Sequence, residues 1–165
     1  MIIAPVDFRD EELFEPKSVL EQEGVDVKIA STITAKCIGM LGGSIIPDIV
    51  YTNVKAEDFD GIVFVGGKGA THYWNDPIAH KLVKDAVSLN KLIGAICIAP
   101  VTLANAGILR GKKVTAWKTE EHKLSDKGAL YTGSRVEYDG KIITANGPTS
   151  ATQFARSIIK GLQTD

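Results

Sequence analysis

The segment that most constrains the fold runs from Leu92 to Pro100 and reads Leu-Ile-Gly-Ala-Ile-Cys-Ile-Ala-Pro. Its first five residues form an unbroken apolar run, which is typical of a strand buried on both faces. A helix-like stretch, 101–106, follows Cys97 almost without a loop. A strand that turns sharply into a helix has the geometry of a nucleophile elbow, where only small neighbours fit. Ala95 and Ala99 are such neighbours, so we predict a reactive thiol at Cys97.

The same turn makes a second prediction, about the acidity of the Cys97 thiol. It should aim the first N–H groups of the helix at the sulfur, which favours the thiolate and lowers the thiol pKa. Cys37, by contrast, lies in a glycine-rich segment with no elbow pattern, and we expect it to be structural. Two cysteines do not make a disulfide framework, so reduced thiols and a cytoplasmic location are expected.

Apolar segments and amphipathic segments alternate along the chain. Strands are expected at 2–6, 25–30, 62–65, 92–96, 114–117, 135–138 and 142–145, with a hairpin over 38–46. Helices are expected at 9–23, 77–89, 101–106 and 149–162. Buried strands that alternate with amphipathic helices predict a three-layer α/β/α sandwich around a mostly parallel, flavodoxin-like sheet. A length of 165 residues suits a single domain over 1–165.

Charge and hydropathy argue against two classes of partner. The formal net charge of −1 gives no basic surface for nucleic acid or for an anionic membrane. No apolar run approaches the ~20 residues that span a bilayer, and no signal peptide is visible. Because the chain opens at once on a strand-like run, we expect a few native residues to precede Met1.

In open parallel sheets, ligands bind beyond the carboxyl ends of the strands. Three such ends stand out: 5–7, Gly66-Gly67 and Cys97. The run Gly66-Gly67-Lys68-Gly69 does not complete a nucleotide-binding pattern, because His72 stands where a third glycine would be needed. Its glycines are better explained by a close approach of the backbone to the elbow. The scattered cysteines and histidines do not have zinc-ligand spacing, so no metal or cofactor is expected.

At these three strand ends, the chain resembles the ThiJ/PfpI superfamily, which has a class I glutamine amidotransferase-like fold. The resemblance rests on several motifs in family order: 9–13, 23–31, 58–67, 94–100, 106–114, 136–140 and 143–148. It implies that Cys97 is the reactive thiol and that the side chain of Glu12 reaches it. It further implies that the backbone N–H groups of Gly67 and Ile98 form an anion pocket. Since two adjacent anions repel, Glu12 should be protonated and should donate to the sulfur.

The chain departs from the family at both positions where a histidine can stand near the thiol. Ile98 follows the cysteine, and Trp117 follows the next strand. Of the histidines present, His72 and His122 are possible accessory residues, whereas His80 lies in an amphipathic helix and is expected at the surface. Since a cysteine hydrolase needs a base, these departures count against efficient peptide hydrolysis.

The resemblance implies an enzyme acting on small carbonyl or amide substrates or on peptides, of the glyoxalase, deglycase or intracellular peptidase kind. Two alternatives stay open. One is a redox-sensing or chaperone-like stress protein, whose cysteine is oxidised without turnover. The other is a non-catalytic oligomeric module. The family forms dimers and larger assemblies, so a homodimer or higher homo-oligomer is expected.

Overall fold

Parallel strands form the centre of the molecule, which is described over residues 1–164 in a computed structural model. Three of them are β6 (Gly61–Phe64), β7 (Leu92–Ile96) and β11 (Ile142–Ala145), with β7 in the middle. β10 (Val136–Asp139) pairs antiparallel with β11 and closes one edge. On the other side, Ile2 bridges Phe64 to Ala30 and so connects this sheet to the next pair of strands. That pair consists of β2 (Ala30–Ser31) and β5 (Ile49–Val50), which run parallel.

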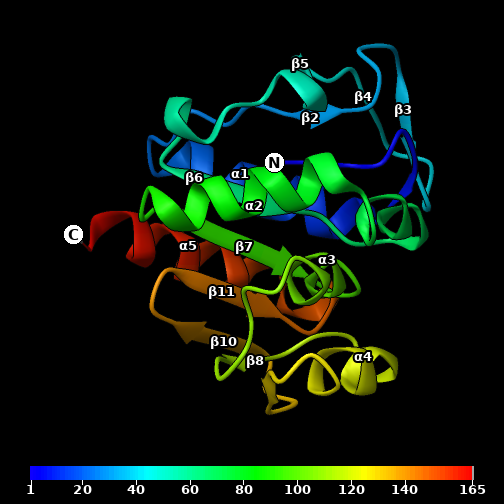
Figure 1. The fold of residues 1–165 in the computed structure, drawn as a ribbon. Helices are drawn as coiled ribbons and strands as arrows, with labels where there is room; N and C mark the ends of the chain where they lie inside the picture. The colour runs from blue at the N-terminus through cyan, green and yellow to red at the C-terminus, as the bar shows by residue number, and fades with distance from the viewer. Residues whose placement is uncertain (165) are drawn as a thin grey trace.

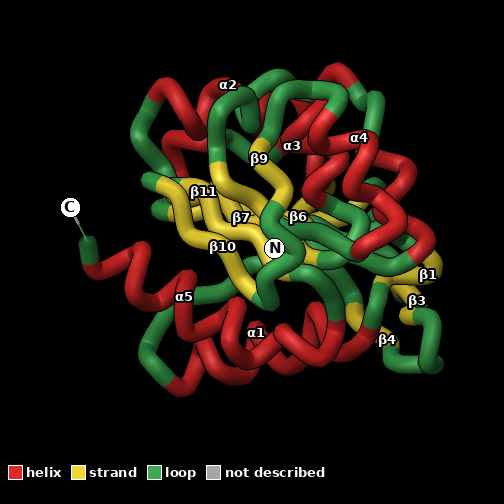
Figure 2. The backbone as a smooth tube through the Cα atoms, turned by 90° about the horizontal axis from the view of Figure 1, so that it is seen from below, coloured by secondary structure: helices red, strands yellow, loops and turns green. Residues whose placement is uncertain are grey.

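Helices cover both faces of this sheet, as Figure 2 shows. α1 (Asp10–Gln22) and α5 (Ala151–Gln163) lie together on one face, and α2 (Pro77–Ser88) and α3 (Pro100–Asn105) lie on the other. Side chains alternate along β7: one set packs with Phe154 of α5, and Ile93 and Ala95 pack with α2 and α3. The predicted three-layer α/β/α arrangement is therefore confirmed.

Two smaller groups of strands flank the central sheet (Figure 1). β1 (Val6–Phe8) pairs with β3 (Cys37–Gly39), which forms the predicted hairpin with β4 (Ser44–Ile45). β8 (Lys113–Val114) pairs with β9 (Leu130–Tyr131) beside the short helix α4 (Glu121–Ser125). Short 3-10 helices lie at Tyr51–Asn53, Ala56–Asp58, Lys68–Tyr73, Lys118–Glu120 and Pro148–Ser150.

The strand β7 begins and ends at the predicted residues, but other predicted strands are too long. The segment 2–6 forms only bridges at Ile2 before β1, although Ile2 and Ile3 donate to Val63 and Ala30 in sheet-like fashion. Of the predicted strand 25–30 only the last residue lies in a strand, β2, and of the predicted strand 114–117 only the first residue does, in β8. Apolar runs mark burial, whereas strand length depends on whether a neighbour offers ladder partners. No sequence pattern predicts α4, which is short and largely polar, or β9, which is Leu130–Tyr131 alone.

One further property bears on location. Over residues 1–164, no helix has both the length and the apolar character needed to cross a membrane.

Candidate active site at the carboxyl end of β7

Cys97 lies directly beyond the carboxyl end of β7, three residues before Pro100, where α3 begins. Its φ is +65°, a left-handed conformation that is costly for a residue with a side chain and is often found at functional turns. The backbone holds it there: its N–H donates to the Ala145 carbonyl (2.9 Å), and its carbonyl accepts from the Trp117 N–H (2.8 Å). Both flanking alanines are buried. The local geometry is that of a strained strand-to-helix elbow.

Glu12 is brought to the same point by the first turn of α1. The helix starts where it does because the Arg9 N–H donates to the Gly66 carbonyl at 2.9 Å. Gly66 touches both predicted site residues: a Cβ there would clash with Glu12 Oε2 and would lie 2.6 Å from the Cys97 Cβ. Only glycine lets the carboxyl and the elbow approach each other so closely.

The Glu12 carboxyl is completely buried, with 0% of the residue exposed. Neither of its oxygens has a hydrogen bond of good geometry within residues 1–164. Burial raises the pKa of Glu12 from 4.5 to about 8, while the Cys97 thiol and the Gly66 N–H pull it down by smaller amounts. At pH 7 the acid form of Glu12 therefore predominates over the carboxylate.

The acidity expected of the Cys97 thiol is wrong. Burial, and next the negative charge of Glu12, raise the thiol pKa well above its ordinary value. The N–H groups of Gly67 and Ile98 act in the opposite direction, but they are outweighed. The sequence pattern shows the helix start but not the depth of the turn or the neighbouring carboxyl. At neutral pH the pair therefore holds protons on both groups in most molecules.

The N–H groups of Gly67 and Ile98 both act on the sulfur, which is where the predicted anion pocket would be. Gly67 has a φ of +98°, and a Cβ there would collide with the backbone of Asp7, Phe8 and Arg9, at the end of β1. Ile98 is fixed from the other side, because the indole Nε1–H of Trp74 donates to its carbonyl at 3.0 Å. No sequence signal pointed to Trp74, since an aromatic residue after a glycine turn is more often packing.

Arg9 is a second residue that the sequence did not single out. Its guanidinium forms a two-point contact with Glu11, at 2.8 and 3.0 Å. Its positive charge also acts on Glu12 and on Cys97, and it lowers the pKa of Glu12. A cation thus lies close enough to favour negative charge at the site.

Within residues 1–164, no histidine forms a hydrogen bond with the Cys97 thiol. His72 is exposed, and its ring packs edge-on against Tyr73 at 5.1 Å between centroids. His122 is exposed on α4. His80 is half-buried rather than fully at the surface, with Nε2 2.8 Å from the Trp74 carbonyl. Within the described chain, no three His, Cys, Asp or Glu side chains cluster as a metal site requires.

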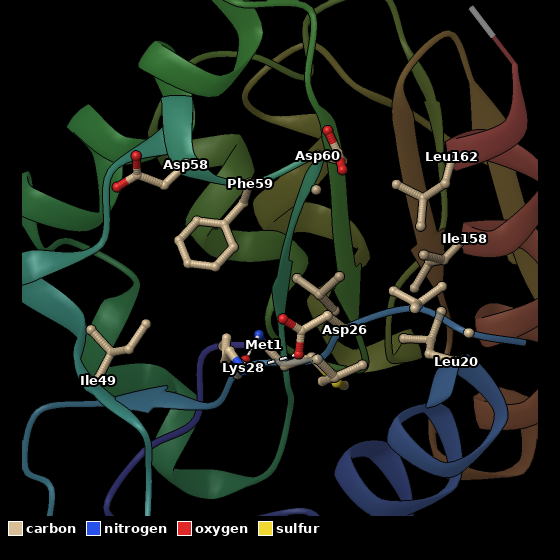
Figure 3. Close-up of a pocket in the computed structure, with 15 residues that line it drawn as sticks. Met1, Leu20, Asp26, Lys28, Ile49, Asp58, Phe59, Asp60, Ile158 and Leu162 are labelled. Atoms are coloured by element: carbon tan, nitrogen blue, oxygen red, sulfur yellow. Dashed lines mark hydrogen bonds and ion pairs between the residues drawn. The ribbon is translucent and has the colours of Figure 1, made fainter. Parts of the chain in front are cut away.

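A cleft of about 450 Å³ lies beside the elbow, and we call it the Trp117 cleft. It is lined by Trp117, Lys118, Glu121, Tyr131, Asn146 and Thr149, among others. A larger hollow of about 650 Å³ lies at the amino ends of the strands, between the start of β6 and the end of α5 (Figure 3). Because its lining includes Met1, Asp60 and Leu162 and no predicted site residue, it belongs to the opposite edge of the sheet.

Comparisons of sequence and structure relate this chain to known proteins. Residues 1–161 match the model of the DJ-1/PfpI family. A glutathione-independent glyoxalase of Caenorhabditis elegans is 31% identical over 99% of this chain and 87% of its own length. A deglycase of Pyrococcus horikoshii is 29% identical over 95% of both chains. The crystal structure of a ThiJ/PfpI domain protein from Brachyspira murdochii superposes with a TM-score of 0.95 at 35% identity, covering 98% of this chain and 93% of that one.

Proposed function

The chain belongs to the DJ-1/PfpI family, and from that membership we propose that it is a cysteine-dependent glyoxalase. The reaction would convert a small 2-oxoaldehyde, such as methylglyoxal, into the 2-hydroxy acid by adding water. One observation carries the proposal: the buried Glu12 carboxyl, whose pKa of about 8 suits a group that both takes and gives protons near neutral pH. Relatives named a glyoxalase and a deglycase support small carbonyl substrates.

The first step is addition of the thiol to the aldehyde carbon. The Glu12 carboxylate takes the thiol proton as the sulfur forms its bond to carbon. The aldehyde oxygen becomes an alkoxide beside the N–H groups of Gly67 and Ile98, which stabilise it. Glu12 then returns the proton to this oxygen and gives a hemithioacetal. Because the thiol pKa is high, a base adjacent to the sulfur is needed at this stage.

The second step moves hydrogen between the two carbonyl carbons. Glu12 takes the proton from the former aldehyde carbon and delivers it to the neighbouring ketone oxygen, which forms an enediol. It then carries the hydroxyl proton of the first carbon to the second carbon, which leaves a thioester of the 2-hydroxy acid. The first carbon is oxidised and the second is reduced, so no external redox partner is consumed. Water hydrolyses the thioester and restores the Cys97 thiol.

Peptide hydrolysis is less well supported by the same geometry. A leaving amine needs an acid, and cysteine peptidases use histidine to supply it. Here Ile98 and Trp117 stand at the family's histidine positions, and the side chains of His72 and His122 are exposed. A glyoxalase needs only a proton shuttle, and one buried carboxyl provides it.

The alternative of an oxidisable cysteine without turnover also has a supporting observation. Two N–H groups, from Gly67 and Ile98, and a protonated Glu12 could hold the oxygens of a sulfinate. The raised thiol pKa counts against it, since peroxide reacts with the thiolate. Both cysteines are unpaired, and we propose that the protein works in a reducing compartment such as the cytoplasm.

We also propose that the protein forms at least a homodimer. Apolar side chains gather on the surface of β1 and of the β3–β4 hairpin, where Val6, Ile38, Leu41 and Ile46 are between 47% and 66% exposed. Burying such side chains against a second copy would remove them from water. Light scattering of the purified protein measures the assembly directly, and a monomer at micromolar concentration would contradict this expectation.

The proposed activity is tested by incubating the protein with methylglyoxal, without glutathione, and measuring lactate. Cys97→Ala should abolish lactate formation, and Glu12→Gln should lower kcat by at least about 100-fold. Cys37→Ser is the matched control, because its thiol is also buried but lies away from the elbow. Equal turnover by Cys97→Ala and the native protein would refute the proposal. No lactate, together with peroxide adding two oxygen atoms to Cys97, would favour the redox alternative.

A further inference from the structure

The Trp117 cleft is joined to the elbow through the backbone of Cys97. The Cys97 N–H donates to Ala145, which directly precedes Asn146 of the cleft, and the Cys97 carbonyl accepts from the N–H of Trp117. Cys97 itself does not line the cleft. Glu12 and Gly66 pack directly against Cys97. Cys97 is nevertheless partly exposed, and the Trp117 cleft is the hollow that these two hydrogen bonds connect to the elbow.

Two aromatic rings in this cleft are held in place before any ligand arrives. The Trp117 ring packs on Gly147, where a Cβ would lie 2.9 Å from the ring carbons Cε3 and Cζ3. The Tyr131 ring is anchored because its hydroxyl donates to the Ala116 carbonyl at 3.3 Å. Yet Trp117 remains 47% exposed, so much of its surface is available to a ligand. Preformed aromatic walls of this kind are typical of sites that bind flat apolar groups.

The size and charge of the cleft narrow the choice of substituent that it can bind. Its volume of about 450 Å³ is far more than the three-carbon chain of methylglyoxal requires. Among the lining residues, Lys118 and Glu121 carry opposite charges that cancel formally. The cleft therefore favours neither an anionic nor a cationic substituent, and the aromatic surface remains as its main feature.

We propose that the Trp117 cleft selects 2-oxoaldehydes that carry an aromatic substituent, with Trp117 as the residue that determines this specificity. The inference rests on the proposed glyoxalase function. For phenylglyoxal the reaction is the addition of one water to give mandelate: the aldehyde carbon is oxidised to the acid, and the ketone carbon is reduced to the alcohol. The same Cys97 and Glu12 steps apply, with the phenyl ring lying against Trp117.

The test compares kcat/KM for phenylglyoxal and for methylglyoxal, from initial rates, in the native protein and in three variants. Trp117→Leu keeps an apolar side chain but removes the ring, and should lower the ratio of phenylglyoxal to methylglyoxal kcat/KM about tenfold. Trp117→Phe keeps a ring and should hold the ratio within about threefold of the native value. Tyr138→Leu is the control: it removes an exposed ring on β10, outside the cleft, and should change neither rate constant.

The outcomes separate the two proposals. If the native protein converts methylglyoxal but prefers it to phenylglyoxal, or if Trp117→Leu leaves the ratio unchanged, the specificity inference is overturned and the glyoxalase proposal stands. If the native protein converts neither aldehyde, the glyoxalase proposal fails and the specificity inference fails with it. A ratio that falls in Trp117→Leu and is kept in Trp117→Phe supports the inference, and the Phe variant shows that the loss is not a folding defect.

Discussion

The buried carboxyl of Glu12 predicts a specific pH dependence of stability. Its pKa is about 8 in the folded protein and 4.5 ordinarily, so between these values the folded protein keeps a proton that the unfolded chain releases. The contribution of Glu12 to the free energy of unfolding is thus fully present below pH 4.5 and is lost as the pH rises through 8. Glu12→Gln has nearly the same shape and no titrating proton, so it should escape that loss.

The magnitude follows from the two pKa values. Between pH 5 and pH 7.5, a carboxyl whose pKa rises from 4.5 to about 8 on folding costs the native protein about 3 kcal/mol. Both pH values lie below the ordinary pKa of the Cys97 thiol, so the thiol stays protonated in the folded and unfolded states. The unfolding free energy of Glu12→Gln, relative to the native protein, should therefore increase by about 3 kcal/mol over this range.

Urea denaturation at pH 5 and pH 7.5 measures this difference for the native protein and the variant. Glu23→Gln, which removes an exposed carboxyl at the end of α1, is the matched control. If the difference in unfolding free energy between Glu12→Gln and the native protein is the same at both pH values, within about 0.5 kcal/mol, the reasoning is refuted. The Glu12 carboxyl would then ionise as easily in the folded protein as in the unfolded chain.

Three further substitutions test the contacts around the site. Gly66→Ala should lower both activity and the free energy of unfolding, the latter by about 1–3 kcal/mol, because a methyl group there collides with Glu12; unchanged urea midpoint and kcat would contradict the close approach. Trp74→Phe removes the donor to the Ile98 carbonyl and should lower kcat about fivefold to tenfold, with little effect on KM, as steady-state kinetics would show. Asp10→Ala removes two hydrogen bonds to backbone N–H groups of the β3–β4 turn, at 2.8 and 2.7 Å, and should cost about 2–4 kcal/mol in chemical denaturation.

Much of the fold is predictable because its signals are local. The apolar run 92–96, the small residues around Cys97 and the helix after it place a strand, a turn and a helix without reference to the rest of the chain. The same holds for α2, which begins at Pro77 as predicted because proline fits the first turn of a helix. Strands that depend on distant partners, such as those predicted at 2–6 and 25–30, lie near the predicted region but are shorter than the apolar pattern indicates.

The chemistry of the candidate site was less predictable. The spacing around Cys97 indicates a turn beside a helix start, and a helix start by itself lowers a thiol pKa. Burial and the Glu12 carboxyl, which comes from α1, raise the pKa of the Cys97 thiol, and together they outweigh the effect of the helix start. The roles of Trp74 and Arg9 near the elbow do not follow from the sequence either, since Trp74 belongs to no motif and Arg9 opens the motif 9–13 without an assigned role.

The sequence by itself therefore determined the class of fold, the family resemblance and the position of the elbow cysteine, because strand periodicity, turn residues and neighbouring small side chains are properties of short segments. The family resemblance implied Glu12 and the N–H groups of Gly67 and Ile98 as neighbours of that cysteine, but only the tertiary structure decided that the thiol pKa is raised and that an aromatic cleft lies where the family can place a histidine. These depend on desolvation and on contacts between residues more than 80 positions apart, such as Glu12 and Cys97, which are set by the packing of α1 against the end of the sheet.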